Sequence, residues 1–199
     1  MIVIHKDFLK VYLTCAETEV VYGGYKVIGE HQSNLRFMYE KRAERKHTAT
    51  MRAQKPYLNF HTSNFLVSKA IMTANPLDVR FRHYGYEDVL FSKVLQEKNI
   101  RIAHIDNPLG FDKFENNDSF LAKTEEGLHT LYQFRNELND YSRMLQTVRQ
   151  LRNIYLTNIL EFVFRWRKNK WKAILCSNRP SIFLFNFYKI GYFLSLYSK

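Results

Sequence analysis

Glycine, proline and cysteine are scarce in this sequence. Its 199 residues contain seven glycines and four prolines, which is few for a loop-rich β-sandwich and excludes collagen-like and low-complexity chains. The two cysteines, Cys15 and Cys176, cannot build a disulfide framework, and neither has a cysteine or histidine neighbour at metal-ligand spacing. The cysteine content therefore favours a reducing compartment.

Long apolar runs are missing as well. The longest stretch without a charged residue is 56–68, and it contains His61 and several polar residues, so the sequence predicts no transmembrane span. The first seven residues hold no long apolar stretch and no small-residue cleavage site, which argues against a signal peptide. If the protein meets a membrane, we expect the contact at the membrane surface.

Apolar and aromatic residues are plentiful. Hydrophobic residues make up 46% of the chain, with 16 Phe, 13 Tyr and 2 Trp. A chain of this length and composition can bury about 70% of its unfolded surface, which excludes disorder. The bulky aromatic side chains and the few glycines favour a fold that contains helices.

The net charge of +11 is concentrated at the C-terminal end. Residues 142–199 hold eleven Lys and Arg against one acidic residue, Glu161, so this segment alone carries +10. The rest of the chain is nearly neutral. A neutral body followed by a basic, aromatic segment predicts that the segment contacts something acidic.

Hydrophobic periodicity alternates between strand and helix in the first 140 residues. Apolar runs predict strands at 2–4, 20–25, 65–67 and 100–105. Helical spacing predicts helices at 8–13, 69–74, 87–95 and from 119 onward. This alternation indicates an α/β body. Residues 141–199 are expected to form two or three helices around the breaker Asn178-Arg179-Pro180.

Three local expectations accompany this assignment. Residues 2–4 are expected to end a buried strand, and Asp7 is expected to cap the helix that follows. Asn117-Asp118 offers an N-cap for the long helix after it. Segment 34–52 has six Lys and Arg and few large apolar residues, so we expect a solvated helix or a mobile segment without chemistry.

The acidic pair Glu87-Asp88 is the feature most suggestive of chemistry. It falls in the first turn of a predicted helix, after Gly85 and beside Tyr84 and Tyr86. One interpretation is structural, because the helix dipole favours a carboxylate there by about 0.3–1 kcal/mol. The other is catalytic: a carboxylate beside a glycine that a substrate can approach accepts a proton from a sugar or alcohol hydroxyl.

Four motifs stand in a characteristic order. They are Val20-Val21-Tyr22-Gly23-Gly24, Thr62-Ser63-Asn64-Phe65-Leu66, Tyr84-Gly85-Tyr86-Glu87-Asp88-Val89-Leu90-Phe91 and His104-Ile105-Asp106-Asn107-Pro108. In this order and spacing the sequence resembles the acceptor-binding half of family 2 glycosyltransferases. These are inverting, nucleotide-sugar-dependent enzymes of the GT-A fold, and the likeness is closest to bacterial members that build surface polysaccharides. It extends through 123–127 and 180–186.

The resemblance implies a fold and a set of roles. Residues 1–140 would form the acceptor-side part of a Rossmann-like GT-A domain, followed by a basic, aromatic helical extension at 141–199. Asp88 would be the general base for the acceptor hydroxyl, and Glu87 would orient the acceptor. The remaining implied cleft residues are Gly23, Gly24, Thr62, Ser63, Asn64, Tyr84, Gly85 and Tyr86. The two glycines would let the backbone approach a ligand, and the two tyrosines would either stack on a sugar or pack.

Two departures concern the metal. The family holds a divalent ion, Mn or Mg, and the donor diphosphate with an Asp-x-Asp motif, which this sequence does not contain. Residues 1–4 resemble the strand that directly follows that motif, so the chain is expected to begin after the donor site. Phe111 stands where many relatives have a histidine ligand. His104 is a candidate metal ligand, with a structural hydrogen-bonding role as the alternative.

The implied partners are a nucleotide sugar and a glycan or lipid-linked acceptor. The alternative to an enzyme is a catalytically inert module that binds acceptor or membrane. For contact with an anionic membrane we expect the cation and tryptophan cluster Arg165, Trp166, Arg167, Lys168, Lys170, Trp171 and Lys172. A solvated helix face and, less favoured, nucleic acid are the alternatives. The expected location is cytoplasmic, peripheral on the inner face of the membrane.

Overall fold

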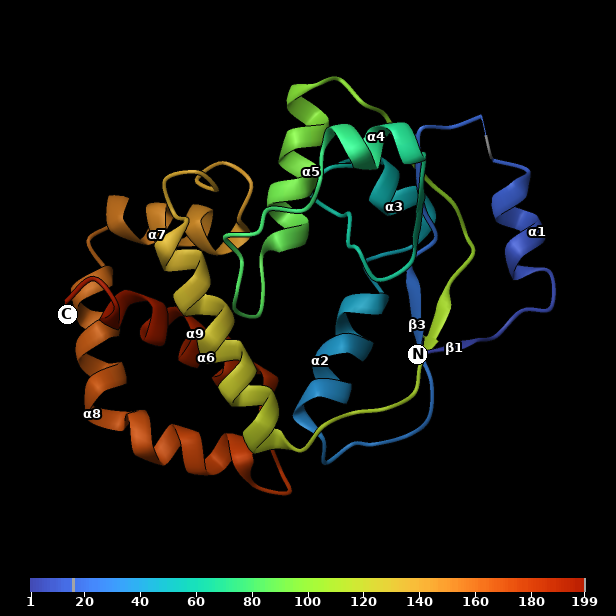
Figure 1. Cartoon of the computed structure of the whole chain (residues 1–199). Coiled ribbons are helices and arrows are strands. Elements are labelled where there is room, and N and C mark those ends of the chain that lie inside the picture. The colour runs from blue at the N-terminus through green and yellow to red at the C-terminus, as the bar shows by residue number, and fades with distance from the viewer. Residues whose placement is uncertain (16, 199) are drawn as a thin grey trace. The chain divides into compact units, whose positions relative to one another are not determined.

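The computed structural model describes residues 1–15 and 17–198, and its contacts divide the chain into two compact units (Figure 1). Unit 1 consists of Met1–Glu30, Glu40–Arg80 and Glu87–Lys113. Unit 2 consists of His31–Tyr39, Phe81–Tyr86 and Phe114–Lys199. The chain therefore passes between the units repeatedly, and helix α2 (Leu35–Glu44) spans one of these passages.

The first sheet of unit 1 is built around strand β2 (Val20–Tyr22). It pairs antiparallel with β4 (Phe65–Val67) and parallel with β5 (Ile102–His104). The side chains of β2 are at most 1% exposed, as expected of an apolar run covered on both faces. Gly24 has a φ of +80°, a left-handed backbone that suits glycine, so the predicted end of the strand at the glycine pair is confirmed.

The second sheet of unit 1 has β6 (Leu109–Phe111) at its centre. It pairs antiparallel with β1 (Ile2–Val3) and parallel with β3 (Tyr25–Val27). The predicted strand near residue 2 is therefore present. It is not buried, contrary to the prediction: Ile2 and Val3 are 45% and 60% exposed because β1 lies at the edge of its sheet.

Short helices accompany the sheets of unit 1. They are α1 (Phe8–Leu13), α3 (Ala49–Ala53), α4 (Lys69–Ala74) and α5 (Glu87–Glu97). The apolar stripe predicted for α5 is confirmed, since Phe91 and Leu95 pack in one buried cluster with Tyr22. Asp7 stands at the start of α1, but its side chain makes no capping hydrogen bond, so that prediction is wrong.

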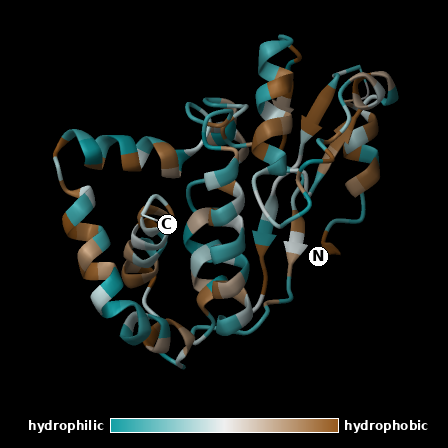
Figure 2. Ribbon diagram, turned by 60° about the vertical axis from the view of Figure 1, so that its left-hand side comes forward, coloured by the Kyte–Doolittle hydropathy of each residue, from teal (hydrophilic) through white to brown (hydrophobic). Residues whose placement is uncertain are grey.

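Helices dominate the part of unit 2 that the structure describes. They are α6 (Asn117–Gln133), α7 (Arg143–Asn153), α8 (Thr157–Cys176) and α9 (Ile182–Ser195). Figure 2 shows hydrophobic and hydrophilic residues interleaved along them, as expected of helices with one apolar face. Phe164, Phe185 and Tyr188 are at most 1% exposed. Gly191 permits the close crossing of α9 and α8, because a Cβ there would lie 2.5 Å from Phe164.

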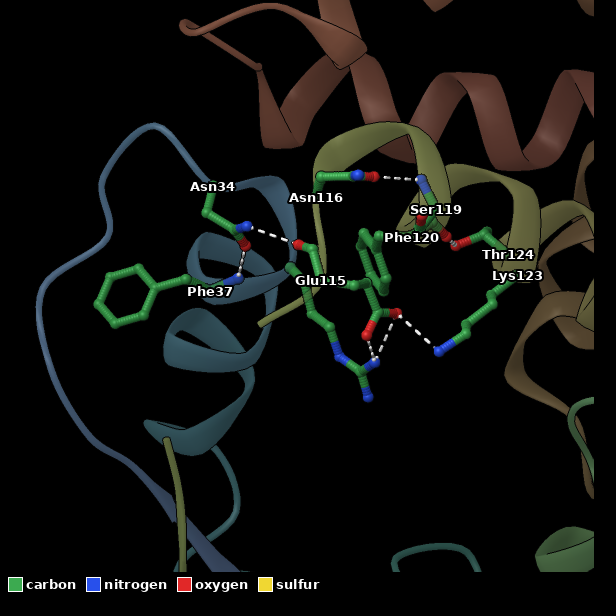
Figure 3. A network of polar contacts seen from close by, with 9 residues as sticks. Asn34, Phe37, Glu115, Asn116, Ser119, Phe120, Lys123 and Thr124 are labelled. Carbon is green, nitrogen blue, oxygen red and sulfur yellow. Dashed lines mark hydrogen bonds and ion pairs between the residues drawn. The ribbon is translucent and has the colours of Figure 1, made fainter. Parts of the chain in front are cut away.

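A polar network ties the start of α2 to the start of α6 within unit 2 (Figure 3). The Asn34 amide donates to the Glu115 carbonyl at 2.7 Å. The Glu115 carboxylate binds Arg36 at 2.6 Å and Lys123 at 3.4 Å. Burial opposes the charge, but the two cations lower the pKa of Glu115 overall. Asn116 caps α6 by accepting from Ser119 N–H, so the true cap precedes the predicted one.

The α/β class is confirmed in its coarse form, as a mixture of helices and small sheets. Two details differ from the sequence prediction. Helix α6 packs against α8 and α9 in unit 2, so the division expected after residue 140 falls before α6. Segment 34–52 is helical, as α2 and α3, but it is not solvated throughout, because Leu35 is fully buried and Arg52 is only 4% exposed.

Candidate functional site

Helix α5 begins with the acidic pair Glu87 and Asp88, as predicted. Oδ2 of Asp88 lies 2.6 Å from Nδ1 of His61, and Oδ1 accepts a hydrogen bond of 2.9 Å from Val89 N–H. The Asp88 side chain remains 23% exposed and the His61 side chain 41% exposed. A carboxylate fixed by an imidazole and reachable from solvent has the geometry that a proton acceptor needs.

The backbone just before this pair is left-handed at two consecutive residues. Gly85 has a φ of +98° and Tyr86 a φ of +67°, which for a bulky L-residue costs on the order of 1–2 kcal/mol. A Cβ at Gly85 would lie 3.1 Å from the backbone of Gly127 in α6. Gly85 is therefore explained by a tight turn and close packing within unit 2, and not by the approach of a ligand as the sequence predicted.

Aromatic rings surround the His61–Asp88 pair. Tyr22, the last residue of β2, makes edge contacts with His61 and with His104, at ring-centre distances of 6.1 and 5.5 Å. His47 stacks on His61 at 6.5 Å. Tyr22 is 1% exposed, and burial raises its pKa to about 12, so its hydroxyl keeps its proton at neutral pH. Because Tyr22 is the last residue of β2 and His104 the last of β5, the His61–Asp88 pair lies where these two parallel strands end.

Arg52 of α3 anchors this end of the sheet. Its Nη2 donates to the carbonyls of Ile105 and Gly23 at 2.8 and 3.3 Å, and its guanidinium lies 5.0 Å from the centre of the Tyr22 ring. Burial lowers the pKa of Arg52, but the carbonyl oxygens and the ring face stabilise its charge. Sequence reasoning assigned this segment no chemistry and missed Arg52.

His104 is held from both sides. Its Nδ1 accepts a hydrogen bond of 3.2 Å from Arg52 Nε, and its Nε2 lies 3.0 Å from the Pro56 carbonyl, to which it donates in the matching tautomer. Burial lowers the pKa of His104 to about 4, and the Arg52 charge acts in the same direction. The ring is therefore neutral near pH 7. These contacts favour the structural role over the metal-ligand role, because a metal ion would have to displace one of them.

Gly23, Gly24 and Asn64 form a buried corner, not a ligand-facing surface as predicted. The Asn64 amide donates to the carbonyls of Gly24 and Asn107 at 2.6 and 2.9 Å, and its Oδ1 accepts from the Tyr12 hydroxyl at 2.8 Å. A Cβ on Gly23 would lie 2.4 Å from the Asn107 carbonyl oxygen, and one on Gly24 would lie 2.5 Å from Arg52. Protein atoms, and not a ligand, occupy the space that the two glycines leave.

Replacing Asn64 by alanine is expected to destabilise the protein by about 1–3 kcal/mol, because it removes three buried side-chain hydrogen bonds and leaves the Asn107 carbonyl without its donor. The Tyr12 hydroxyl keeps its bond to the backbone carbonyl of residue 64, and the Gly24 carbonyl keeps its bond from Leu109 N–H. Chemical denaturation followed by circular dichroism measures the loss. Gln96→Ala, which removes an exposed amide side chain from α5 in the same unit, is the matched control and should change the free energy of unfolding by less than about 1 kcal/mol. Equal stability of the two variants would contradict the structural role of Asn64.

The other predicted cleft residues divide between the two units. Thr62 and Ser63 precede β4 in unit 1, and a hydrogen bond from Ser63 reaches the Tyr22 hydroxyl. Tyr84 and Tyr86 belong to unit 2. Tyr84 is 50% exposed and accepts a hydrogen bond of 3.1 Å at its carbonyl from Thr130. Of the predicted set, the structure brings Ser63 and Asp88 together around Tyr22 and His61.

The described residues do not fit the divalent ion that the resemblance implies. Within 1–15 and 17–198, no three histidine, cysteine, aspartate or glutamate side chains lie close enough together to hold a metal ion. His61 and Asp88 form one pair of such side chains, and His83 and Glu126 form another. We therefore assign no catalytic step to a metal in this chain.

Helix α8 carries the predicted membrane segment. Trp166 is 69% exposed, and the guanidinium of Arg167 lies 4.1 Å from its ring centre. Trp171 packs instead against Phe164 in the core of unit 2, at a ring-centre distance of 6.2 Å, which corrects its predicted membrane contact. The cations on the exposed side of this segment are Arg165, Lys170 and Lys172, whereas Lys168 lies over the Tyr192 ring.

Exposed apolar side chains extend from Trp166 toward the start of α8. This apolar stripe consists of Ile154, Tyr155, Ile159, Phe162 and Trp166, with exposures of 59%, 87%, 58%, 70% and 69%. The last three share one helix face, because they are three and four residues apart. Phe162, Arg165 and Trp166 border a hollow of about 360 Å³. Among the helices described, none has the length and apolar character to cross a bilayer.

Comparisons of the chain with protein-family models, with curated proteins and with solved structures find no match. The resemblance to family 2 glycosyltransferases therefore depends on the sequence motifs alone, that is, on the four ordered motifs and segments 123–127 and 180–186.

Proposed function

We propose that this chain is the acceptor-side part of an inverting glycosyltransferase, which transfers a sugar from a nucleotide-sugar donor to a glycan or lipid-linked acceptor in surface polysaccharide biosynthesis. The observation that carries the proposal is the 2.6 Å contact between His61 and Asp88. It holds a reachable carboxylate beside the C-terminal ends of parallel strands, where α/β sheets commonly bind ligands. The order of the four motifs supports the same assignment.

In this proposal Asp88 takes the proton of the acceptor hydroxyl. The hydroxyl oxygen forms a bond to the anomeric carbon as the bond from that carbon to the diphosphate oxygen breaks, and the electron pair leaves on the nucleoside diphosphate. One displacement inverts the anomeric centre. His61 and Val89 N–H keep the carboxylate oriented, and Asp88 afterwards returns the proton to solvent. Glu87 orients the acceptor through its other hydroxyls.

The apolar stripe supports a membrane as the second partner. Aromatic and aliphatic side chains that lie exposed among Arg and Lys are typical of a helix in the headgroup layer of an anionic membrane. The only acidic residue of the last 58 residues, Glu161, lies 3.4 Å from Arg165, which reduces its repulsion of anionic lipid. In this proposal the protein binds peripherally to the inner, cytoplasmic face of the membrane, where a lipid-linked acceptor is within reach.

A second candidate function is an inert module that binds acceptor without transferring sugar, which the lack of an Asp-x-Asp motif favours. A panel of radiolabelled nucleotide sugars, offered with Mg²⁺ or Mn²⁺ and oligosaccharide acceptors, separates the two candidates. Release of nucleoside diphosphate with formation of a labelled glycan supports the enzyme. The inert module is supported if the protein binds glycan, the Asp88→Asn variant does not, and no nucleoside diphosphate is released. The absence of both contradicts both.

A further inference from the structure

The region next to the His61–Asp88 pair contains a pocket of about 550 Å³, wholly within unit 1. Its lining comes from the start of β3, the last turns of α2, the loop into α3, α3 itself, and Asp106 and Pro108. A volume of this size falls within the range of small-molecule sites in proteins. This pocket could not be predicted from the sequence, because its walls come from segments that are far apart along the chain.

The charge of the pocket is positive. Lys26, Lys41, Arg45 and Arg52 line it, against the two acidic residues Glu44 and Asp106. One pair is already neutralised, since Lys41 binds Glu44 at 3.0 Å. Lys26 and Arg45 are exposed, and their side chains have no ion pair or hydrogen bond with any of the residues described. Two unpaired cations at the rim of a pocket favour a negatively charged ligand.

The inner wall of the pocket is rigid. Arg52 is 4% exposed and donates hydrogen bonds to the carbonyls of Gly23, Ile105 and His47. Its Nε donates to His104. These contacts direct the guanidinium at the backbone and fix the position of its charge behind the pocket, so the Arg52 charge adds to the field of the rim cations without having to move.

The pocket also adjoins the proposed base. His47 lines the pocket and stacks on His61 at a ring-centre distance of 6.5 Å, and His61 in turn binds Asp88. The two stacked imidazole rings of His47 and His61 thus connect the positive pocket to the carboxylate of Asp88. A saccharide that presents a hydroxyl to Asp88 can therefore extend a neighbouring group into the pocket.

We propose that this pocket binds the negatively charged group of an acidic acceptor saccharide, a phosphate or a carboxylate, while a hydroxyl of the same saccharide faces Asp88. The inference rests on the proposed function, which it deepens by naming the acceptor class. Lys26 and Arg45 make the contacts with the anionic group, and Arg52 provides the fixed charge behind them.

Isothermal titration calorimetry at low salt with the full chain tests this assignment. The probes are glucose, glucose 1-phosphate, glucuronic acid, inorganic phosphate and uridine diphosphate. We expect glucose 1-phosphate or glucuronic acid to bind about tenfold or more tightly than glucose, because charge-assisted hydrogen bonds are the stronger ones. Comparison of these two acids tells whether the site prefers phosphate or carboxylate.

The variant Lys26→Ala/Arg45→Ala should weaken binding of the acidic sugar about tenfold or more. The matched control Lys98→Ala/Arg101→Ala removes the same charge from exposed positions outside the pocket and should leave the affinity unchanged. Equal weakening by both variants would show a general charge effect and overturn the assignment.

Three further results overturn the proposal. They are equal affinity for glucose and the acidic sugars, inorganic phosphate binding as tightly as glucose 1-phosphate, and uridine diphosphate competing for the same cations, which would make the pocket a donor site. Because binding is measured without turnover, this test and that of the proposed function can fail separately. Sugar transfer with no charge preference would refute only the acidic acceptor, whereas charge-dependent binding without transfer would refute only the enzyme.

Discussion

Replacing Asp88 by asparagine is expected to reduce the rate of sugar transfer by about a thousandfold, the typical contribution of a general base. The amide has nearly the same shape as the carboxylate and can still accept a hydrogen bond from His61 or Val89, but it cannot take up the acceptor proton. Since Asp88 and His61 are partly exposed, the change to their contact should alter the free energy of unfolding by no more than about 1 kcal/mol. The initial rate of nucleoside diphosphate release measures the effect.

Glu97→Gln is the matched control for this substitution. It makes the same acid-to-amide change at the other end of α5, where the Glu97 carboxylate is 56% exposed and pairs with Lys93 at 3.5 Å. Its transfer rate should equal that of the parent protein. If Asp88→Asn retains the parental rate while both variants stay folded, Asp88 is not the base, and the structural interpretation of the acidic pair at the helix start takes its place.

Local patterns predicted those parts of the fold that depend on neighbouring residues. Strand β2 is a short apolar run ended by two glycines, and helix α5 shows its apolar stripe at helical spacing. The start of α5 at Glu87 follows from the same pattern. These features could be read from the sequence because each depends on residues only a few positions apart.

The environment of the acidic pair could not be predicted in this way. His61 lies 27 residues before Asp88, and Arg52 reaches carbonyl groups 29 and 53 residues away. A cation in a basic segment gives no sign that it is buried, since its burial depends on backbone carbonyls that the fold brings to it. For the same reason Asn64 was predicted to face a ligand, although its hydrogen bonds all go to protein atoms.

Composition alone also could not predict which side chains of α8 are exposed. Trp166 and Trp171 stand five residues apart, so they point to different sides of a helix with 3.6 residues per turn. Trp171 shares the buried side with Phe164, seven residues before it, whereas Trp166 shares the exposed side with Phe162 and Ile159. The prediction that 165–172 forms one membrane-binding cluster ignored this periodicity.

Substituting Phe162 and Trp166 by serine is expected to lower the partition coefficient onto anionic vesicles by about a hundredfold. Transfer of one exposed aromatic side chain of the apolar stripe from water to the membrane is favourable by about 1.5 kcal/mol or more of free energy. Loss of each side chain should therefore lower the partition coefficient by at least about a factor of ten. The measurement is sedimentation with phosphatidylcholine vesicles that contain phosphatidylserine. Vesicles of phosphatidylcholine alone should bind the parent protein more weakly, since the cations near the stripe then lack their partners.

Leu9→Ser/Leu13→Ser is the matched control, because it removes two apolar side chains that are 72% and 73% exposed from α1 in unit 1 and leaves the basic helices intact. Its sedimentation should equal that of the parent. If Phe162→Ser/Trp166→Ser also sediments like the parent, the apolar stripe is not the membrane contact. A different result would assign the basic segment to nucleic acid. In that case neither double variant changes sedimentation, binding falls steeply as the salt concentration rises, and duplex DNA competes with the vesicles for the protein. The conclusion that α8 inserts into the membrane surface therefore requires that the aromatic substitutions, which leave the net charge unchanged, reduce vesicle binding.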